Sequence, residues 1–138
     1  MAGYSGTPLV KKLGVKSGQA LSLLNAPKES LKLFADFPRS EKRGDGLIDV
    51  TLEFEKSLAS LKDELPRAKK QMATDGMIWV VWPKKASGVA TDLNENVIRE
   101  IGLKIGLVDI KVCAIDETWS GLKFVIPVKA RAKAGAKS

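Results

Sequence analysis

The stretch Met77-Ile-Trp-Val-Val-Trp82 decides how the rest of the sequence is interpreted. It is an uninterrupted apolar run of strand length, and every residue after Met77 is aromatic or β-branched. Because no polar residue alternates with the apolar ones, the pattern predicts a strand covered on both faces, as at the centre of a parallel sheet. The preceding Asp75-Gly76 predicts a turn.

The residues downstream of this run predict a helix and a hairpin. A loop over 83–91 leads to a helix that we expect to be capped by Asp92 and closed by Gly106. One face of this helix carries the apolar residues Leu93, Val97, Ile101 and Ile105. Strands predicted over 108–115 and 122–126 are separated by the polar stretch 116–121, which indicates a hairpin.

Upstream, near-alternating apolar residues predict a strand over 47–54, and Ser57 begins a helical pattern. Proline inside a helix costs about 3 kcal/mol. We therefore expect Pro66 to divide this pattern into two pieces, 56–64 and 66–73.

The first third of the chain predicts a β-turn-α step. A strand over 19–24 is followed by a helix from Pro27 to about Phe34, and the charged stretch 39–46 predicts a loop or weak edge strand. A short leading helix is marked by Thr7-Pro8 at its start and Gly14 just past its end.

Strands that alternate with helices and end in a hairpin predict an α/β fold, a three-layer sandwich with a mostly parallel, Rossmann-like sheet. We expect one antiparallel hairpin strand at the edge. The layout resembles the C-terminal half of the Rossmann-like methyltransferase fold. In cofactor-binding units of that kind a glycine-rich turn follows the first strand, but the turn at 24–28 has no glycine, so no cofactor is predicted.

Composition sets limits on the chemistry. The 138 residues contain no histidine and one cysteine, which excludes histidine-dependent catalysis, histidine-ligated metal sites and an internal disulfide. No metal site is predicted. No apolar run is long enough to cross a membrane, and no signal-peptide pattern is present, so we expect a cytoplasmic protein of bacterial type.

The formal charge of +7 includes a basic C-terminal stretch without large apolar groups. We expect one domain over 1–127 and a disordered tail over 128–138. The tail carries Lys129, Arg131, Lys133 and Lys137, which predict at most weak, sequence-independent binding of nucleic acid. A homo-oligomer is left open, because residues 4–7 either fold over the sheet end or pack against a second copy.

Three segments resemble a family of small uncharacterised bacterial proteins, a domain of unknown function. They are Gly3-Tyr-Ser-Gly-Thr-Pro-Leu9 with Lys12-Leu-Gly14, Trp82-Pro-Lys-Lys-Ala-Ser-Gly-Val-Ala-Thr-Asp-Leu93, and Lys111-Val-Cys-Ala-Ile-Asp-Glu-Thr-Trp-Ser-Gly-Leu-Lys-Phe-Val125. With their layout they cover nearly the whole chain, although 28–56 contains no matching motif. The resemblance implies no activity.

The loop 83–91 is the first candidate site. It places two cations, two hydroxyls and a glycine ahead of a helix N-terminus, a combination that favours an anion. The residues concerned are Lys84, Lys85, Ser87, Gly88 and Thr91. The alternative is an ordinary solvated connection in which Asp92 already uses the free N–H groups.

The hairpin loop is the second candidate. Asp116 or Glu117 is a candidate general base, or else pairs with Lys84 or Lys85. Trp82 and Trp119 either form an aromatic wall for a planar ligand or pack in the core. Trp79 is assigned to the core, and Cys113 to a buried, inert position.

Three functions follow from these residues. The first is a module without catalysis that binds a small anionic ligand or a protein partner at the carboxyl ends of the strands. The second is a degenerate methyltransferase-like transferase, with a pocket lined by Asn25, Glu53, Trp82 and Asp116. The third is the weak nucleic-acid binding of the tail.

Overall fold

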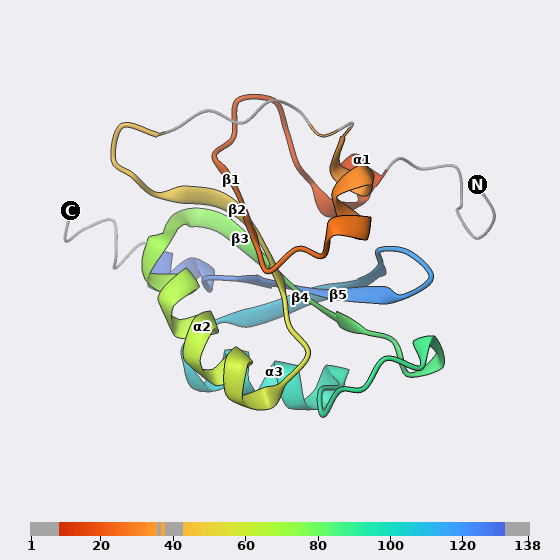
Figure 1. Ribbon diagram of the computed structural model, residues 1–138. Coiled ribbons are helices and arrows are strands. Elements are labelled where there is room, and N and C mark those ends of the chain that lie inside the picture. Colours follow the sequence, from red (N-terminus) through yellow and green to blue (C-terminus); the bar gives the residue numbers. More distant parts are fainter. Residues whose placement is uncertain (1–8, 36, 38–42, 132–138) are drawn as a thin grey trace.

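The computed structural model describes residues 9–35, 37 and 43–131 (Figure 1). Within them the chain alternates strands with helices before it ends in a hairpin. The elements are α1 (Leu9–Leu13), β1 (Leu21–Leu24), the 3₁₀ helix η1 (Lys28–Phe34), β2 (Ile48–Phe54), α2 (Leu58–Gln71), β3 (Met72–Pro83), the 3₁₀ turn η2 (Lys85–Ser87), α3 (Glu95–Lys104), β4 (Val108–Ala114) and β5 (Trp119–Val125).

The sheet has the strand order β1-β2-β3-β5-β4. The pairings of β1 with β2 and of β2 with β3 are parallel, whereas β5 runs antiparallel to both β3 and β4. The α/β class is therefore confirmed, and half of the pairings are parallel. We expected the reversed strand at the edge of the sheet, but it lies inside, between β3 and β4. The reason is that β5 carries the buried Leu122 and Phe124, while β4 is largely exposed.

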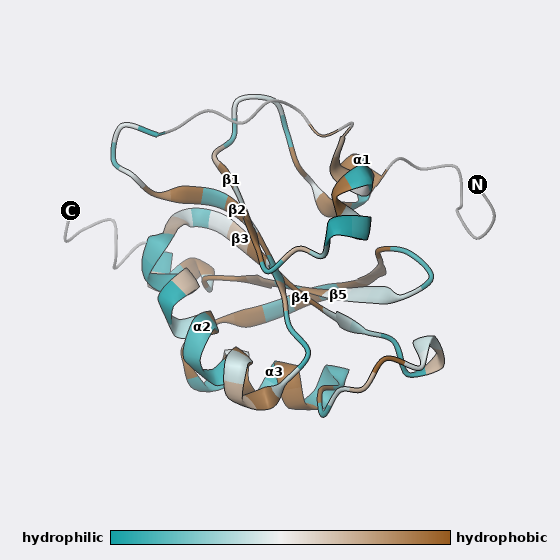
Figure 2. Cartoon of the chain, viewed as in Figure 1, coloured by the Kyte–Doolittle hydropathy of each residue, from teal (hydrophilic) through white to brown (hydrophobic). Residues whose placement is uncertain are grey.

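Helices cover both faces of the sheet and give three layers (Figure 1). On one face α2 and α3 pack through Leu61, Leu65 and Ile98. On the other face α1 and η1 pack around Trp79, whose indole Nε1 donates a hydrogen bond of 3.0 Å to the Leu13 carbonyl. The assignment of Trp79 to the core is confirmed. Figure 2 shows the hydrophobic colour along the central strands and mostly hydrophilic residues on α2.

Pro66 does not interrupt α2, contrary to the sequence prediction. Leu61 and Leu65 before the proline and Ala68 beyond it are all buried on the same face. Packing of this continuous face against the sheet offsets the cost of the missing hydrogen bond.

The predicted turn at Asp75-Gly76 is also wrong, because β3 begins at Met72, directly after α2. The pairing of β2 with β3 is irregular here, with Ile48 opposite Met72 but Val50 opposite Met77. A Cβ at Gly76 would lie 2.9 Å from the Asp49 carbonyl oxygen, so glycine permits the close approach of the two strands rather than a turn.

Asp92 does not cap α3. The cap is Asn94, whose side-chain oxygen accepts a hydrogen bond of 2.9 Å from the Val97 amide. Asp92 instead accepts a hydrogen bond of 2.7 Å from the Leu58 amide, at the start of α2. The aspartate therefore connects the two helices that cover one face of the sheet.

The remaining boundaries are close to those expected. The leading helix is confirmed by α1, although Thr7-Pro8 and residues 4–7 lie outside the described residues. The predicted helix after Pro27 is a 3₁₀ helix, and β5 begins at Trp119 rather than at Leu122. The edge strand β4 carries a register shift between Asp109 and Lys111.

The first four residues of the predicted tail, 128–131, have helical backbone. The Arg131 amide donates a 3.0 Å hydrogen bond to the Pro127 carbonyl, and its guanidinium Nε donates one of 2.7 Å to the Ile126 carbonyl. Residues 132–138, which include Lys133 and Lys137, lie outside the described part of the chain.

Candidate functional site

A pocket of about 300 Å³ opens at the carboxyl ends of β1 and β2. Its walls come from the residue after β1, the link between β2 and α2, the first turns of α2, and the start of β5. The lining residues are Asn25, Phe54, Glu55, Lys56, Ser57, Ser60, Glu64 and Trp119. Open α/β sheets bind ligands outside the carboxyl ends of their strands, so the position is one where a site is expected.

Asn25 ties three elements together at this pocket. Its backbone is left-handed, with φ 59°. Its side-chain Nδ2 donates hydrogen bonds of 3.2 Å to the Phe54 carbonyl and 3.0 Å to Glu64 Oε2. Asparagine tolerates this backbone conformation better than most residues. The turn that lacks a glycine is therefore built by asparagine.

Two glutamates, one near the end of β2 and one directly after it, are buried next to the pocket. Glu53 and Glu55 alternate with Leu52 and Phe54, which pack against the α1 face, so both glutamates point to the α2 face. Their exposed fractions are 0% and 2%. Both carboxyl oxygens of Glu53 and Oε2 of Glu55 have no hydrogen-bond partner among the described residues.

Burial changes the proton affinity of both carboxyl groups. Loss of solvent, and then the neighbouring Glu55 carboxyl, raises the pKa of Glu53 to about 10. Burial also raises the pKa of Glu55. At neutral pH Glu53 is therefore protonated and uncharged.

The start of α2 forms the polar wall of the pocket. Ser57 caps the helix, with its hydroxyl accepting a hydrogen bond of 3.2 Å from the Ser60 amide. The Ser60 hydroxyl in turn donates one of 2.6 Å to Glu64 Oε1. Because the Leu58 amide is bound to Asp92, two N–H groups of this first turn are already paired.

Both hydroxyl groups of the loop 83–91 form hydrogen bonds with other groups of the protein. The Ser87 hydroxyl donates to the Lys84 carbonyl at 2.6 Å and accepts from the Val89 amide at 3.1 Å. Thr91 Oγ1 donates to the Lys56 carbonyl at 2.6 Å and so fastens the loop to the pocket rim. Lys85 and Gly88 are exposed and Lys84 is half-buried. Anion binding by this loop stays a prediction.

The hairpin loop lies beside the loop 83–91, with the Lys84 amide donating a hydrogen bond of 2.7 Å to the Thr118 carbonyl. Asp116 Oδ1 accepts hydrogen bonds from the Thr118 and Trp119 amides, at 2.8 and 2.7 Å, and therefore shapes the turn. Glu117 is exposed. Among the ion pairs of the described residues, none joins these acids to Lys84 or Lys85.

The two tryptophans considered for an aromatic wall lie on opposite faces of the sheet. Trp82 packs in the α2–α3 core, and Trp119 packs on the α1 face, edge-on to Phe54 with ring centroids 5.1 Å apart. They do not form one wall. Trp119 alone lines the pocket.

Cys113 is only partly buried, contrary to expectation, because its strand β4 is the exposed edge of the sheet. Its thiol donates a hydrogen bond of 3.3 Å to the Ala114 carbonyl. In the described part of the chain no cluster of acidic residues and cysteine has the arrangement of a metal site. No helix in that part has the length and apolar character needed to span a membrane.

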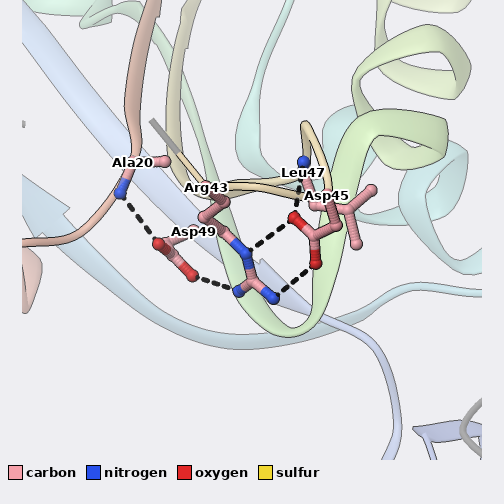
Figure 3. Close-up of polar contacts among 5 residues, drawn as sticks. All are labelled: Ala20, Arg43, Asp45, Leu47 and Asp49. Atoms are coloured by element: carbon pink, nitrogen blue, oxygen red, sulfur yellow. Dashed lines mark hydrogen bonds and ion pairs between the residues drawn. The ribbon is translucent and has the colours of Figure 1, made fainter. Parts of the chain in front are cut away.

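A second polar cluster lies at the opposite, amino-terminal end of β2 (Figure 3). The Arg43 guanidinium forms ion pairs of 2.8 Å with both Asp45 and Asp49, and Asp49 accepts a hydrogen bond of 2.8 Å from the Ala20 amide. Hydrogen bonding to Arg43 lowers the pKa of Asp45. The cluster fixes the loop before β2 to the chain before β1. Each acidic group already has a partner, so we interpret it as structural.

Similar solved structures define the class of the fold. A TehB-like S-adenosylmethionine-dependent methyltransferase from Corynebacterium glutamicum matches with a TM-score of 0.55 and 10% identity over 91% of both chains. Magnesium protoporphyrin IX methyltransferase from Synechocystis, with bound S-adenosylmethionine, matches with a TM-score of 0.56 and 12% identity over 86% of this chain and 74% of that one. Fibrillarin from Aeropyrum pernix, in complex with S-adenosylmethionine, matches with a TM-score of 0.57 and 12% identity over 89% of this chain and 70% of that one.

The chain therefore has a Rossmann-like fold of the methyltransferase type, as the layout of the sequence indicated. It belongs to the family described as a protein of unknown function, DUF3052, whose model matches residues 40–128. The predicted resemblance to a family without assigned activity is confirmed. No curated protein sequence matches the chain.

Sequence reasoning named only part of this pocket. It named Asn25 and Trp119, and it named Glu53, which lies beside the pocket. It did not name Glu55, Ser60 or Glu64. A signal was present in Glu53-Phe-Glu55, where two acids at alternate positions flank the last residue of a strand, with a helix following shortly after.

Proposed function

We propose that this protein is a small-molecule-binding module whose ligand occupies the pocket at the carboxyl ends of β1 and β2. One observation carries the proposal: Glu55 lines the pocket, is 2% exposed, and its Oε2 has no hydrogen-bond partner among the residues that the structure describes. A buried polar atom of this kind costs about 1–3 kcal/mol unless something else supplies a partner. A ligand with a hydrogen-bond donor would do so.

The position of the pocket agrees with this proposal. It takes residues from the ends of two parallel strands and from the helix that follows the second of them. Ligands of open α/β sheets bind at such places because loops and helix N-termini converge there. We propose binding without catalysis, because neither candidate general base lines the pocket: Asp116 shapes its turn, and Glu117 is exposed.

The proposal is tested with isotope-labelled protein and a library of small cations, neutral compounds and anions, with inorganic phosphate among the anions. We expect some members to shift the backbone amide signals of Asn25, Ser57 and Ser60. Ser60→Phe should abolish these shifts by filling the pocket. Ala59→Phe is the matched control, because Ala59 is the exposed neighbour of Ser60 on the same helix and does not line the pocket.

Two outcomes would contradict the proposal: no compound shifts these amides, or Ser60→Phe binds as well as the control. Shifts confined to the amides of 84–91 on addition of phosphate would instead favour the anion site that the sequence predicted. Binding of a protein partner would place the shifts on another surface.

A second candidate function is binding of S-adenosylmethionine, as in a methyltransferase. It is favoured by the fold and by similar structures described with S-adenosylmethionine or S-adenosylhomocysteine bound. Calorimetry with S-adenosylmethionine tests it directly. Binding at micromolar concentration would favour this candidate, whereas the absence of heat at millimolar concentration would discard it.

A further inference from the structure

Glu53 lies on β2 and Glu55 is the first residue after the strand, two positions on, so their carboxyl groups project to the same side; Glu55 also lines the pocket. We propose that the ligand of this pocket carries a positively charged group, an ammonium, guanidinium or sulfonium, which binds against this pair of carboxyls. The inference rests on the proposed function and adds the chemical class of the ligand.

Three oxygens of the pair lack hydrogen-bond partners in the described part of the chain. Both oxygens of Glu53 and one of Glu55 are buried without hydrogen bonds among the described residues, whereas buried polar atoms in native structures are nearly always paired. Lys56, the basic residue on the pocket wall, is exposed and forms none of the ion pairs in the described part of the chain. The described residues therefore leave oxygens of the pair without a partner, and a ligand in the pocket would supply one.

The surroundings of the pair favour an organic cation over the other classes of ligand. Glu64 lines the same pocket, and its charge together with that of Asp63 acts on Glu55 from α2. An anion would face these acids across the pocket. A metal ion is not favoured, because no metal-binding cluster is found among the described residues.

The charges that surround the pair also predict how binding depends on pH. Burial raises the pKa of Glu55, as do the charges of Glu64 and Asp63, whereas the neighbouring Glu53 carboxyl and the Ser60 hydroxyl lower it. Lys56 is at the rim of the pocket. On its β3 side the strand is flanked by the apolar Val80 and Val81. A bound cation opposes the effect of the neighbouring acids and favours the ionised carboxylate, so binding releases a proton.

The experiment uses cations matched with isosteres that lack the charge. Choline is paired with the neutral alcohol in which carbon replaces its nitrogen, and S-adenosylmethionine with S-adenosylhomocysteine, which lacks the sulfonium. Acetate and inorganic phosphate serve as anions. We expect the cation of at least one pair to bind about tenfold more tightly than its isostere, with shifts at the amides of Asn25, Ser57 and Ser60. Its binding should tighten as pH rises, and calorimetry in buffers of different ionisation heat should detect proton release.

Glu55→Gln should remove the preference for the cation, and Glu55→Asp should retain part of it. Glu117→Gln is the control, because it removes an equal charge from the same end of the sheet outside the pocket. If isosteres or anions shift the same amides as strongly as the cations do, and Glu55→Gln changes nothing, the inference is wrong and the proposed function stands. If no compound shifts these amides, both fail.

Discussion

The carboxyl group of Glu53 lies in the core with neither oxygen hydrogen-bonded among the described residues, and its pKa is raised from 4.5 to about 10. The folded chain therefore holds a proton that the unfolded chain has lost between about pH 4.5 and about pH 10. The stability that this group contributes is fully present below about pH 4.5 and is lost as pH rises towards about 10. The slope is at most about 1.4 kcal/mol per pH unit.

We predict that Glu53→Gln removes this dependence, because glutamine has the shape of the protonated acid and does not titrate. Between about pH 5 and about pH 8, wild type should lose about 2–4 kcal/mol of unfolding free energy relative to the variant. Urea unfolding at both pH values measures the difference. Glu100→Gln, at an exposed position of α3, should follow wild type, and a Glu53→Gln curve parallel to wild type would contradict the prediction.

Asn25 combines an unusual backbone with hydrogen bonds to two other elements. We predict that Asn25→Ala lowers the free energy of unfolding by about 2–3 kcal/mol, since alanine loses the hydrogen bonds and pays about 1–2 kcal/mol for the left-handed conformation. Asn25→Gly loses only the hydrogen bonds and should cost about 1 kcal/mol. Equal losses in urea unfolding would show that the backbone conformation carries no strain.

At the residue scale, sequence reasoning succeeded where one side chain has one ordinary role. Trp79 was assigned to the core because it lies in an unbroken apolar run. The burial of Glu55 was not predicted, because an acid that alternates with apolar residues normally points to solvent. Here helices cover both faces of the sheet, so either face of β2 is buried.

Among the elements, α3 is held against the sheet by a close contact at Gly102. A Cβ at this position would lie 2.2 Å from Cε1 of Phe124 on β5. We predict that Gly102→Ala destabilises the protein by about 1–3 kcal/mol, although alanine favours a helix by about 1 kcal/mol, because overpacking outweighs propensity.

Chemical unfolding of Gly102→Ala, Phe124→Leu and the double variant tests this contact. The smaller leucine should recover part of the loss, so the two single effects should not add. Glu100→Ala on the exposed face of α3 should change stability by less than about 0.5 kcal/mol. A Gly102→Ala variant more stable than wild type would contradict the assignment.

The elements show where local patterns suffice and where packing decides. The strands of the sheet and the helices α1 and α3 were predicted, since each has a clear apolar pattern bounded by polar residues or glycine. The continuity of α2 through Pro66 and the start of β3 at Met72 were not, because both depend on contacts with distant segments. The same contacts place Ser60 and Glu64 beside β2 and build the pocket wall.

For the whole molecule, the basic stretch after Pro127 is the expected carrier of any nucleic-acid binding. Four contacts, from Lys129, Arg131, Lys133 and Lys137, give a salt slope of at most about 0.9 × 4 on logarithmic axes. We predict that raising salt from about 50 to about 200 mM weakens binding to duplex DNA roughly a hundredfold. Truncation after Pro127 should remove most of the binding, as measured by fluorescence anisotropy.

Truncation after Arg131 is the matched control, because it keeps the 128–131 turn with Lys129 and Arg131 and should lower the slope by about half. The prediction fails if the shorter protein still binds one DNA sequence tightly at the higher salt concentration. In that case the folded part would itself read the sequence.

The irregular register of the edge strand β4 affects whether a strand from another chain can add to the sheet. Ile110 and Val112 on this strand are 54% and 44% exposed, and an open apolar edge ordinarily recruits a strand from another chain. The shift between Asp109 and Lys111 breaks the regular spacing of hydrogen-bonding groups, and the charged Lys111 adjoins the break. A sixth strand would have to carry a matching irregularity to pair along the whole edge. At this edge the sheet thus resists fibril-like extension through an irregularity in the edge strand itself.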